Sequence, residues 1–289
     1  MYPELFQFGP LHVRSYGVLM AVAFVVGTFL GLRESRRLGL DEDKVVNVIL
    51  VTLIASVFGA RLLYVLEHLP EFRREWTSAL ALWQGGLTLY GGIAAGTFAG
   101  LVAAKRMGLP VWITADALTP ALALGTFFGR LGCFLNGCCY GHPTSQPWGV
   151  VFPLDSFAHL EFGNQPVHPS QLYNALAGLL LFGAFYGLRG RFKVPGVLFW
   201  SFIVVFALVR IPLDLTRAYE TDAVLLRVGT LDVTESQFMS LGMILFGALM
   251  ILRLRRTVSL AEPPDPPKAG ARRPSDGLPD PPAAGAPRP

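Results

Sequence analysis

Charged side chains are scarce in this chain of 289 residues. Asp, Glu, Lys and Arg make up 15% of the sequence, against about a quarter in soluble domains, while 52% of the residues are hydrophobic. This scarcity excludes an ordinary water-soluble fold. The formal net charge of +4 does not indicate nucleic-acid binding, because the basic residues lie in short loops between apolar runs. The sequence therefore predicts an integral membrane protein without a nucleic-acid partner.

Basic residues are missing from one set of loops. The segment 131–167 contains no Lys or Arg, and the loop after the second apolar run contains only Arg73 and Arg74. The opposite loops, "RESRRLGLDEDK", "KRMG", "RGRFK" and "RLRR", hold four, two, three and three. Since Lys and Arg favour the cytoplasmic side, this asymmetry predicts an N-terminus outside and a C-terminus inside. The first run lacks a positive segment before it and a small-residue cleavage site after it, which favours a retained helix over a signal peptide.

Seven apolar runs are present, and most reach the roughly 17–25 residues that cross a bilayer. We expect an all-α integral membrane protein with about seven transmembrane helices, the last two spanning if their flanks are included. In the third run, "GGLTLYGGIAAG" supplies small residues that let helices approach closely. The runs cover residues 16–32, 45–66, 85–104, 111–129, 172–188, 195–209 and 240–252.

The end of the chain has a different composition. Residues 263–289 hold ten of the 22 prolines and almost nothing that could bury apolar surface. Such a segment buries too little apolar surface to offset the conformational entropy that its backbone would lose on folding. We therefore predict a transmembrane catalytic domain over 1–256 and a disordered cytoplasmic Pro-rich tail over 257–289.

Polar residues recur at the predicted outer ends of the spans. Taken singly, an arginine there is an interface anchor, a tyrosine belongs to the aromatic belt, and an aspartate pairs with arginines along its own helix. Arginines from three separate spans at one level instead predict an anion site in the outer leaflet. The residues at this level are Tyr16, Arg61, Tyr90, Arg130, Asn136, His168, Gln171, Arg210, Asp214 and Arg217.

The chemistry of arginine narrows the choice of anion. Its planar guanidinium donates two parallel hydrogen bonds to phosphate oxygens, and such charge-assisted bonds are strong where water is excluded. A phospholipid headgroup reaches such a site from within the membrane. The sequence therefore predicts a protein that binds an anionic phospholipid, either to modify it or to move it.

The segment "GRLGCFLNGCCYG" resembles the signature G-R-x-G-N-F-x-N-x-E-x-x-G of bacterial prolipoprotein diacylglyceryl transferases. Cys133 stands where the signature has asparagine, and Cys138 where it has glutamate. Further similarity runs in order from about residue 5 to 256, through "VRSYG", "GARLLYVL", "WQGGLTLYGG", "HPSQLY" and "RIPLDLTR". The matching signature residues are Gly129, Arg130, Gly132, Phe134, Asn136 and Gly141.

The resemblance implies a reaction and a location. In this family the sn-1,2-diacylglyceryl group of phosphatidylglycerol passes to the lipobox cysteine thiol of a prolipoprotein, a thioether forms, and glycerol 1-phosphate leaves. The protein would lie in the bacterial inner membrane, with membrane lipids around it and its active site facing the outer leaflet. A non-catalytic phospholipid-binding or lipid-translocating relative is the alternative, suggested by the departures at Cys133, Cys138 and Tyr90.

The resemblance also implies roles for individual residues. Arg130 and Arg210 would bind the headgroup and stabilise the leaving phosphate, and Arg61, Asn136 and Gln171 would be supporting donors. Tyr16, Gly141 and Arg217 complete the expected lipid-binding set. We expect no cofactor.

The proton acceptor is left open between two residues. The thiolate is the nucleophile, so a group must take the thiol proton. The family histidine falls at Tyr90, which the predicted span places about two turns below its outer start. A phenol accepts a proton poorly near neutral pH unless nearby arginines lower its pKa. Tyr90 therefore acts as an activated phenolate or a hydrogen-bond donor, or else His168 is the base.

The three cysteines lie close together in the sequence, at 133, 138 and 139. Their spacing is not a familiar metal pattern, although His142 could add a ligand for zinc. Outside the membrane, thiols can also oxidise. We assign no metal here, and interpret these cysteines as small packing residues or as one disulfide with one free thiol.

Overall fold

The computed structural model describes residues 4–8, 11–73, 76–81, 85–154, 156–219, 224–228 and 231–260. Arg74 and the Pro-rich segment beyond residue 260 lie outside these ranges. The last helix continues to Leu260, four residues past the predicted domain boundary at 256. The statements on structure below concern the described residues.

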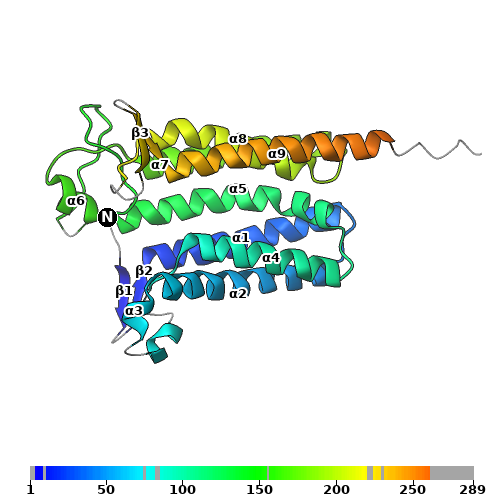
Figure 1. The fold of residues 1–289 in the computed structure, drawn as a ribbon, viewed down its shortest axis with the longest axis horizontal. Coiled ribbons are helices and arrows are strands. Elements are labelled where there is room, and N and C mark those ends of the chain that lie inside the picture. Colours follow the sequence, from blue (N-terminus) through cyan, green and yellow to red (C-terminus); the bar gives the residue numbers. More distant parts are fainter. Residues whose placement is uncertain are drawn as a thin grey trace, which may run out of the picture.

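Seven long helices run side by side in alternating directions (Figure 1). Six of them are long and apolar enough to cross a membrane. The exception, α4, has 18 residues, contains several glycines and ends in Lys105 and Arg106, which lowers its hydropathy. The all-α membrane fold is thus confirmed, while the seventh span and the orientation stay predictions. The helices are α1 (Ser15–Arg37), α2 (Glu42–Glu67), α4 (Leu89–Arg106), α5 (Val111–Asn136), α7 (Ser170–Leu188), α8 (Val197–Asp214) and α9 (Glu235–Leu260).

Short elements gather at the end where α1, α4, α7 and α9 begin, here called the site end (Figure 1). Two antiparallel hairpins precede α1 and α9, and the helix-only expectation missed both of them. At the opposite end, here called the basic end, the described residues form one short element, the 3-10 turn η3 (Arg189–Arg191). The elements of the site end are β1 (Glu4–Phe8), β2 (Leu11–Arg14), α3 (Leu69–Phe72), η1 (Trp76–Leu80), α6 (Phe157–Phe162), β3 (Val224–Val228) and β4 (Leu231–Thr234).

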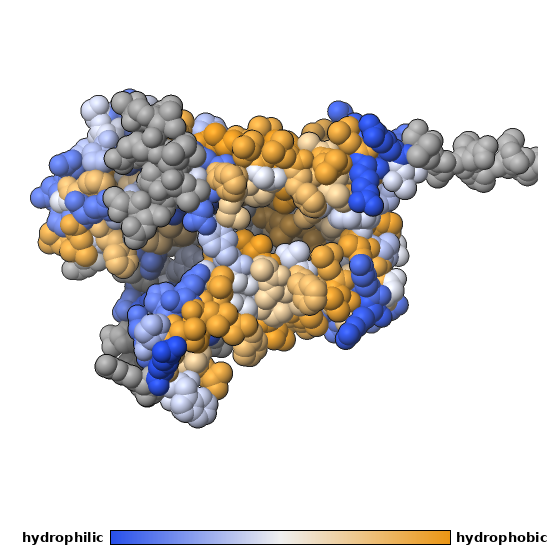
Figure 2. Space-filling view, in the orientation of Figure 1, coloured by the Kyte–Doolittle hydropathy of each residue, from blue (hydrophilic) through white to orange (hydrophobic). Residues whose placement is uncertain are grey.

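The outer surface of the helices is apolar. Figure 2 shows hydrophobic side chains over the middle of the molecule, with hydrophilic residues towards its two ends. Large side chains point outward from the bundle, and Phe29 and Phe98 are each 72% exposed. Such a surface is stable only where lipid tails cover it, because each exposed apolar side chain costs free energy in water.

Glycines let α2 and α4 pack backbone against backbone. A Cβ atom on Gly91 would overlap the carbonyl oxygen of Gly59, and one on Gly96 would overlap the hydroxyl of Ser56. Close approach of this kind is how helices associate where lipid removes the hydrophobic driving force. The close packing predicted for this glycine-rich run is confirmed, and it fixes the position of the residues at the start of α4.

Gly91→Ala should therefore destabilise the protein, whereas Gly125→Ala should not. Forcing a methyl group into a closely packed contact costs roughly 1–3 kcal/mol. A Cβ on Gly125 in α5 meets no atom within 4 Å, so the same substitution there adds only helix propensity. Thermal unfolding in detergent measures both, and equal unfolding temperatures for the two variants would contradict this packing.

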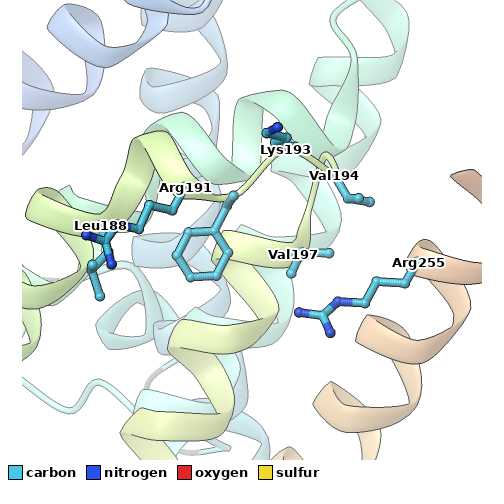
Figure 3. Close-up of a pocket in the computed structure, with 7 residues that line it drawn as sticks. Leu188, Arg191, Lys193, Val194, Val197 and Arg255 are labelled. Carbon is cyan, nitrogen blue, oxygen red and sulfur yellow. The ribbon is translucent and has the colours of Figure 1, made fainter.

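The basic end concentrates positive charge. The carboxylate of Glu34 is buried there between Arg37, at 2.6 Å, and Arg189, at 2.9 Å, and so joins α1 to the end of α7. Beside the start of α8 lies a cavity of about 430 Å³, where Figure 3 shows Arg191, Lys193 and Arg255 among apolar side chains. These residues belong to the loops that the charge asymmetry predicts to be cytoplasmic.

Candidate functional site

The site end is held together by backbone pairing between distant segments. The loop after α5 pairs with the segment before α7, where the amide of Gly141 donates to the His168 carbonyl at 2.9 Å. It also pairs with the segment after α8, where the amide of His142 donates to the Thr216 carbonyl at 3.1 Å. Three predicted site segments, 130–141, 168–171 and 210–217, thereby meet at one place.

Gly141 lies at the centre of this crossing. A Cβ there would come within 2.6 Å of the His168 side chain and 2.5 Å of the Ser170 hydroxyl, and would overlap the Thr216 carbonyl. Only glycine therefore fits between the two partner segments. Its contribution to the site is this close approach of backbones.

Arg130 carries a positive charge without a protein counterion. It lies on α5, six residues before the end of the helix, and is half-buried. Its guanidinium forms no ion pair or hydrogen bond with any described residue. Its charge acts on Tyr16, whose ring packs against Gly132, two residues further along α5. The donors of this planar guanidinium are therefore not used by the described protein.

Arg210 is only partly neutralised. Its Nε donates to the Ser236 hydroxyl at 2.8 Å and lies 3.4 Å from the Asp214 carboxylate, one turn away on α8. Asp214 is buried and also accepts hydrogen bonds from Ser236, at 2.5 Å, and from Tyr219, at 2.8 Å. The two terminal nitrogens of Arg210 have no partner among the described residues and are available to a ligand.

Arg217 lies beside the loop that follows α5. Its guanidinium packs over the Tyr219 ring, 4.6 Å from the centroid, and its buried Nε has no partner among the described atoms. Burial raises the pKa of Tyr219, so this phenol stays protonated and donates to Asp214. An unpartnered buried donor costs free energy, and a bound anion would remove that cost.

Tyr90 lies at the very start of α4, which begins at Leu89. The predicted depth of about two turns is therefore wrong, because residues 85–88 form a loop instead of helix. The Tyr90 phenol lies near enough to Glu235, the first residue of α9, for that carboxylate to act on it, and the charge of Arg210 acts on the same phenol. Three helices thus bring a phenol, a carboxylate and a guanidinium together.

Gln171 is fully buried, and only one of the two polar groups of its side-chain amide forms a hydrogen bond. Its Nε2 donates to the Cys138 carbonyl at 2.7 Å, while its Oε1 has no partner. Asn136 ends α5, and its side chain interacts with the Cys138 thiol. Both amides thus position the loop that carries the cysteines.

His168 and Arg61 are already engaged by the protein. His168 Nδ1 lies 3.2 Å from the Tyr173 hydroxyl, which accepts a hydrogen bond from Trp148 at 2.7 Å. Arg61 donates to the carbonyls of Ser78, Ala79, Gly85 and Gly86 and holds the segment before α4 in place. Neither residue contacts Arg130 or Arg210 in the described structure, and their predicted roles remain untested.

The three cysteines form a cluster, and their sulfur atoms all lie within 4.8 Å of one another. Hydrogen bonds from the thiols of Cys133 and Cys138 lower the pKa of Cys139, and the charges of Arg217 and Arg130 act in the same direction.

Sequence reasoning missed Glu235, Ser236 and Tyr219. They surround Arg210 and Tyr90, yet they lie on either side of a hairpin that contains no apolar span or site motif. A carboxylate at the first position of a helix ordinarily indicates only a favourable interaction with the helix dipole. The one available signal was the predicted depth of the start of α9, which matches that of Arg210.

The fold and the site together define a multi-pass helical membrane protein with several arginines gathered at one end of its bundle. A profile of the family described as prolipoprotein diacylglyceryl transferase matches residues 3–253, and the chain belongs to that family. The recognition made from the sequence motifs is confirmed, as is the enzyme class it implied.

Proteins named phosphatidylglycerol–prolipoprotein diacylglyceryl transferase are similar over most of this chain. The protein of Geobacter sulfurreducens is 36% identical over 261 residues, which cover 88% of this chain and 95% of the relative. That of Synechococcus elongatus is 34% identical over 253 residues, covering 86% and 85%, and that of Thermus thermophilus 33% over 272 residues, covering 86% and 96%. The non-catalytic alternative is not favoured by these names.

Proposed function

We propose that the site end of this chain transfers the diacylglyceryl group of phosphatidylglycerol to the lipobox cysteine thiol of a prolipoprotein. The names of the relatives supply the two substrates. The observation that carries the proposal is Arg130, a half-buried cation with no counterion among the described residues. A phosphodiester headgroup supplies the missing negative charge, and a phospholipid reaches this depth from within the membrane.

The arginines have different tasks in this scheme. Arg130 binds the headgroup phosphate, and the free terminal nitrogens of Arg210 stabilise the charge that builds on the departing glycerol phosphate. The unpartnered Nε of Arg217 offers a further donor. The unpartnered Oε1 of Gln171 accepts from a headgroup hydroxyl. Tyr16, packed on Gly132, lies near enough to Arg130 for that charge to act on its phenol.

Tyr90 and Glu235 form a relay for the thiol proton. As the sulfur attacks the glyceryl carbon and the carbon–oxygen bond to phosphate breaks, the phenol oxygen takes the thiol proton. At the same time it passes its own proton to the Glu235 carboxylate. The phenol therefore never needs to become a stable phenolate, which removes the objection raised by its high pKa. The proton returns to water from Glu235, which is exposed.

Lipid reaches the site laterally between α4 and α9. Figure 2 shows the surface hollowed there, with apolar residues lining the hollow. Tyr90 begins one of these helices and Glu235 the other, so the polar relay lies at the site end of an apolar passage. This arrangement suits a molecule with two acyl chains and a charged headgroup.

The orientation follows from charge. The Lys- and Arg-rich loops at the basic end favour the cytoplasm, so the site end faces the outer leaflet of the bacterial inner membrane. Residues 1–256 form the catalytic domain in this scheme, and the Pro-rich tail lies in the cytoplasm.

Impermeant thiol reagents test this orientation in intact cells. A cysteine at Ser145, exposed at the site end, should be labelled from outside, and one at Gly190, exposed at the basic end, only after permeabilisation. The parent chain, with its three cysteines, gives the background. The reverse labelling pattern would place the site in the inner leaflet.

Incubating the purified chain with phosphatidylglycerol and a lipobox peptide tests the activity. We expect a peptide heavier by one diacylglyceryl group, with one glycerol phosphate released for each product. A peptide whose cysteine is replaced by serine is the control, since its hydroxyl is a far weaker nucleophile than a thiolate. Lipid binding without any thioether product would support the non-catalytic alternative.

A further inference from the structure

The cysteine cluster has the composition of a site for a soft metal ion. Cys133 lies in the last turn of α5, and Cys138 and Cys139 lie just after it. Within the described ranges these three form the one group of three or more Cys, His, Asp or Glu whose donor atoms are close enough to share an ion. Each thiol is partly buried. The set contains sulfur donors alone, which suit thiophilic ions and not Mg²⁺ or Ca²⁺.

The distances require little rearrangement. With metal–sulfur bonds of about 2.3 Å, three sulfur atoms around one ion lie roughly 4 Å apart. The three Sγ atoms already lie within 4.8 Å of one another. Shortening the sulfur–sulfur distances by less than about 1 Å would complete the site, and rotation of the cysteine side chains can supply this movement.

The backbone is shaped to bring the thiols together. Gly137 caps α5 in the left-handed conformation with φ 75°, and Cys139 has φ 62°, the only non-glycine residue with positive φ in the described chain. Such a conformation costs a non-glycine residue of order 1–3 kcal/mol and is kept only where the surroundings impose it. The buried Gln171 donates to the carbonyl of Cys138, in the peptide that joins Cys138 to Cys139.

The surrounding charge also favours occupation. Three thiolates around a divalent ion carry a net negative charge, and the positive charges of Arg130 and Arg217 act at Cys139. We propose that Cys133, Cys138 and Cys139 bind one thiophilic metal ion through three thiolates. The ion would fix the end of α5, and thereby the helix that carries Arg130, to the loop before Tyr140.

Cadmium binding to the reduced full-length protein in detergent tests the proposal. We expect one Cd²⁺ per chain, a sulfur-to-cadmium charge-transfer absorption, and a rise in unfolding temperature with Cd²⁺ concentration. Excess Mg²⁺ should not compete. Cys133→Ser and Cys139→Ser should each lose the band and weaken binding at least tenfold, with unchanged unfolding temperatures in the absence of metal.

His142→Ala is the matched control, because it removes a nearby exposed metal-binding side chain that lies outside the cluster. It should keep the full band. Loss of the band in this variant, absence of Cd²⁺ binding in the reduced parent protein, or isolation of two of the cysteines as a disulfide would each overturn the three-thiolate site. Transfer activity enters none of these readouts, so the proposed reaction can fail independently.

Discussion

Replacing Arg130 by alanine should lower the rate of diacylglyceryl transfer by about 10² to 10³ while leaving the protein folded. One preorganised donor to developing charge typically contributes this much, and Arg130 makes no ion pair or hydrogen bond with the described protein that would be lost. Arg130→Lys should restore little activity, because an ammonium cannot donate in parallel to two phosphate oxygens. Turnover of phosphatidylglycerol with a lipobox peptide provides the measurement, with thermal unfolding recorded alongside.

Arg73→Ala is the matched control for this experiment. Arg73 is an exposed arginine at the same end of the molecule. Its replacement removes one positive charge, as Arg130→Ala does, but leaves the arginines of the site unchanged. It should retain nearly full activity. Near-normal turnover in Arg130→Ala, or an equal loss in both variants, would refute Arg130 as the phosphate ligand. Arg210→Ala should resemble Arg130→Ala in rate but also lower stability, since it leaves the buried Asp214 carboxylate without its ion pair.

Tyr90→Phe should slow transfer at least tenfold, because it keeps the ring and removes only the hydroxyl that moves the proton. A positioned acid or base typically contributes roughly 10² to 10⁴, so a tenfold loss is the smallest effect expected of this role. Glu235→Gln should cause a similar loss, since the amide cannot receive the proton. Tyr90→His should retain substantial activity, because imidazole accepts a proton near neutral pH.

Coupling between the two residues separates a relay from simple packing. If the phenol and the carboxylate act as one unit, the double variant should be no slower than the slower single variant. Tyr186→Phe makes the same chemical change at the basic end and should leave the rate unchanged. Full activity in Tyr90→Phe would make the ring a packing residue. If Tyr90→Phe is fully active and His168→Ala loses most of the transfer rate, His168 is the base.

The predicted positions of the helices were close to those observed. Each of the seven apolar runs overlaps a long helix, because an apolar segment in lipid must satisfy its backbone hydrogen bonds internally. The boundaries were less certain where small and polar residues flank a span. Residues 85–88 were included in the third run yet form a loop, and this moves Tyr90 to the first turn of α4.

The residues of the site were predicted with uneven success. Predicted depth and the family resemblance selected Arg130, Arg210 and Arg217, which the structure brings to one end of the bundle. Depth alone could not reveal that the Arg61 guanidinium donates hydrogen bonds to the protein's own carbonyls. Those carbonyls lie in the segment before α4, far from Arg61 in the sequence. It also gave no indication that His168 is engaged by Tyr173.

Composition and pattern by themselves determined that this chain is a helical membrane protein, which family it belongs to, and where its arginines lie along the helices. These properties depend on hydropathy and local order, which neighbouring residues encode. Only the tertiary structure decided which cations lack a counterion, that Glu235 meets Tyr90, and that three thiols face one another. Those relations join residues far apart in the chain, and the physical reason is that the strength of a charge or hydrogen bond depends on partners that only packing brings within reach.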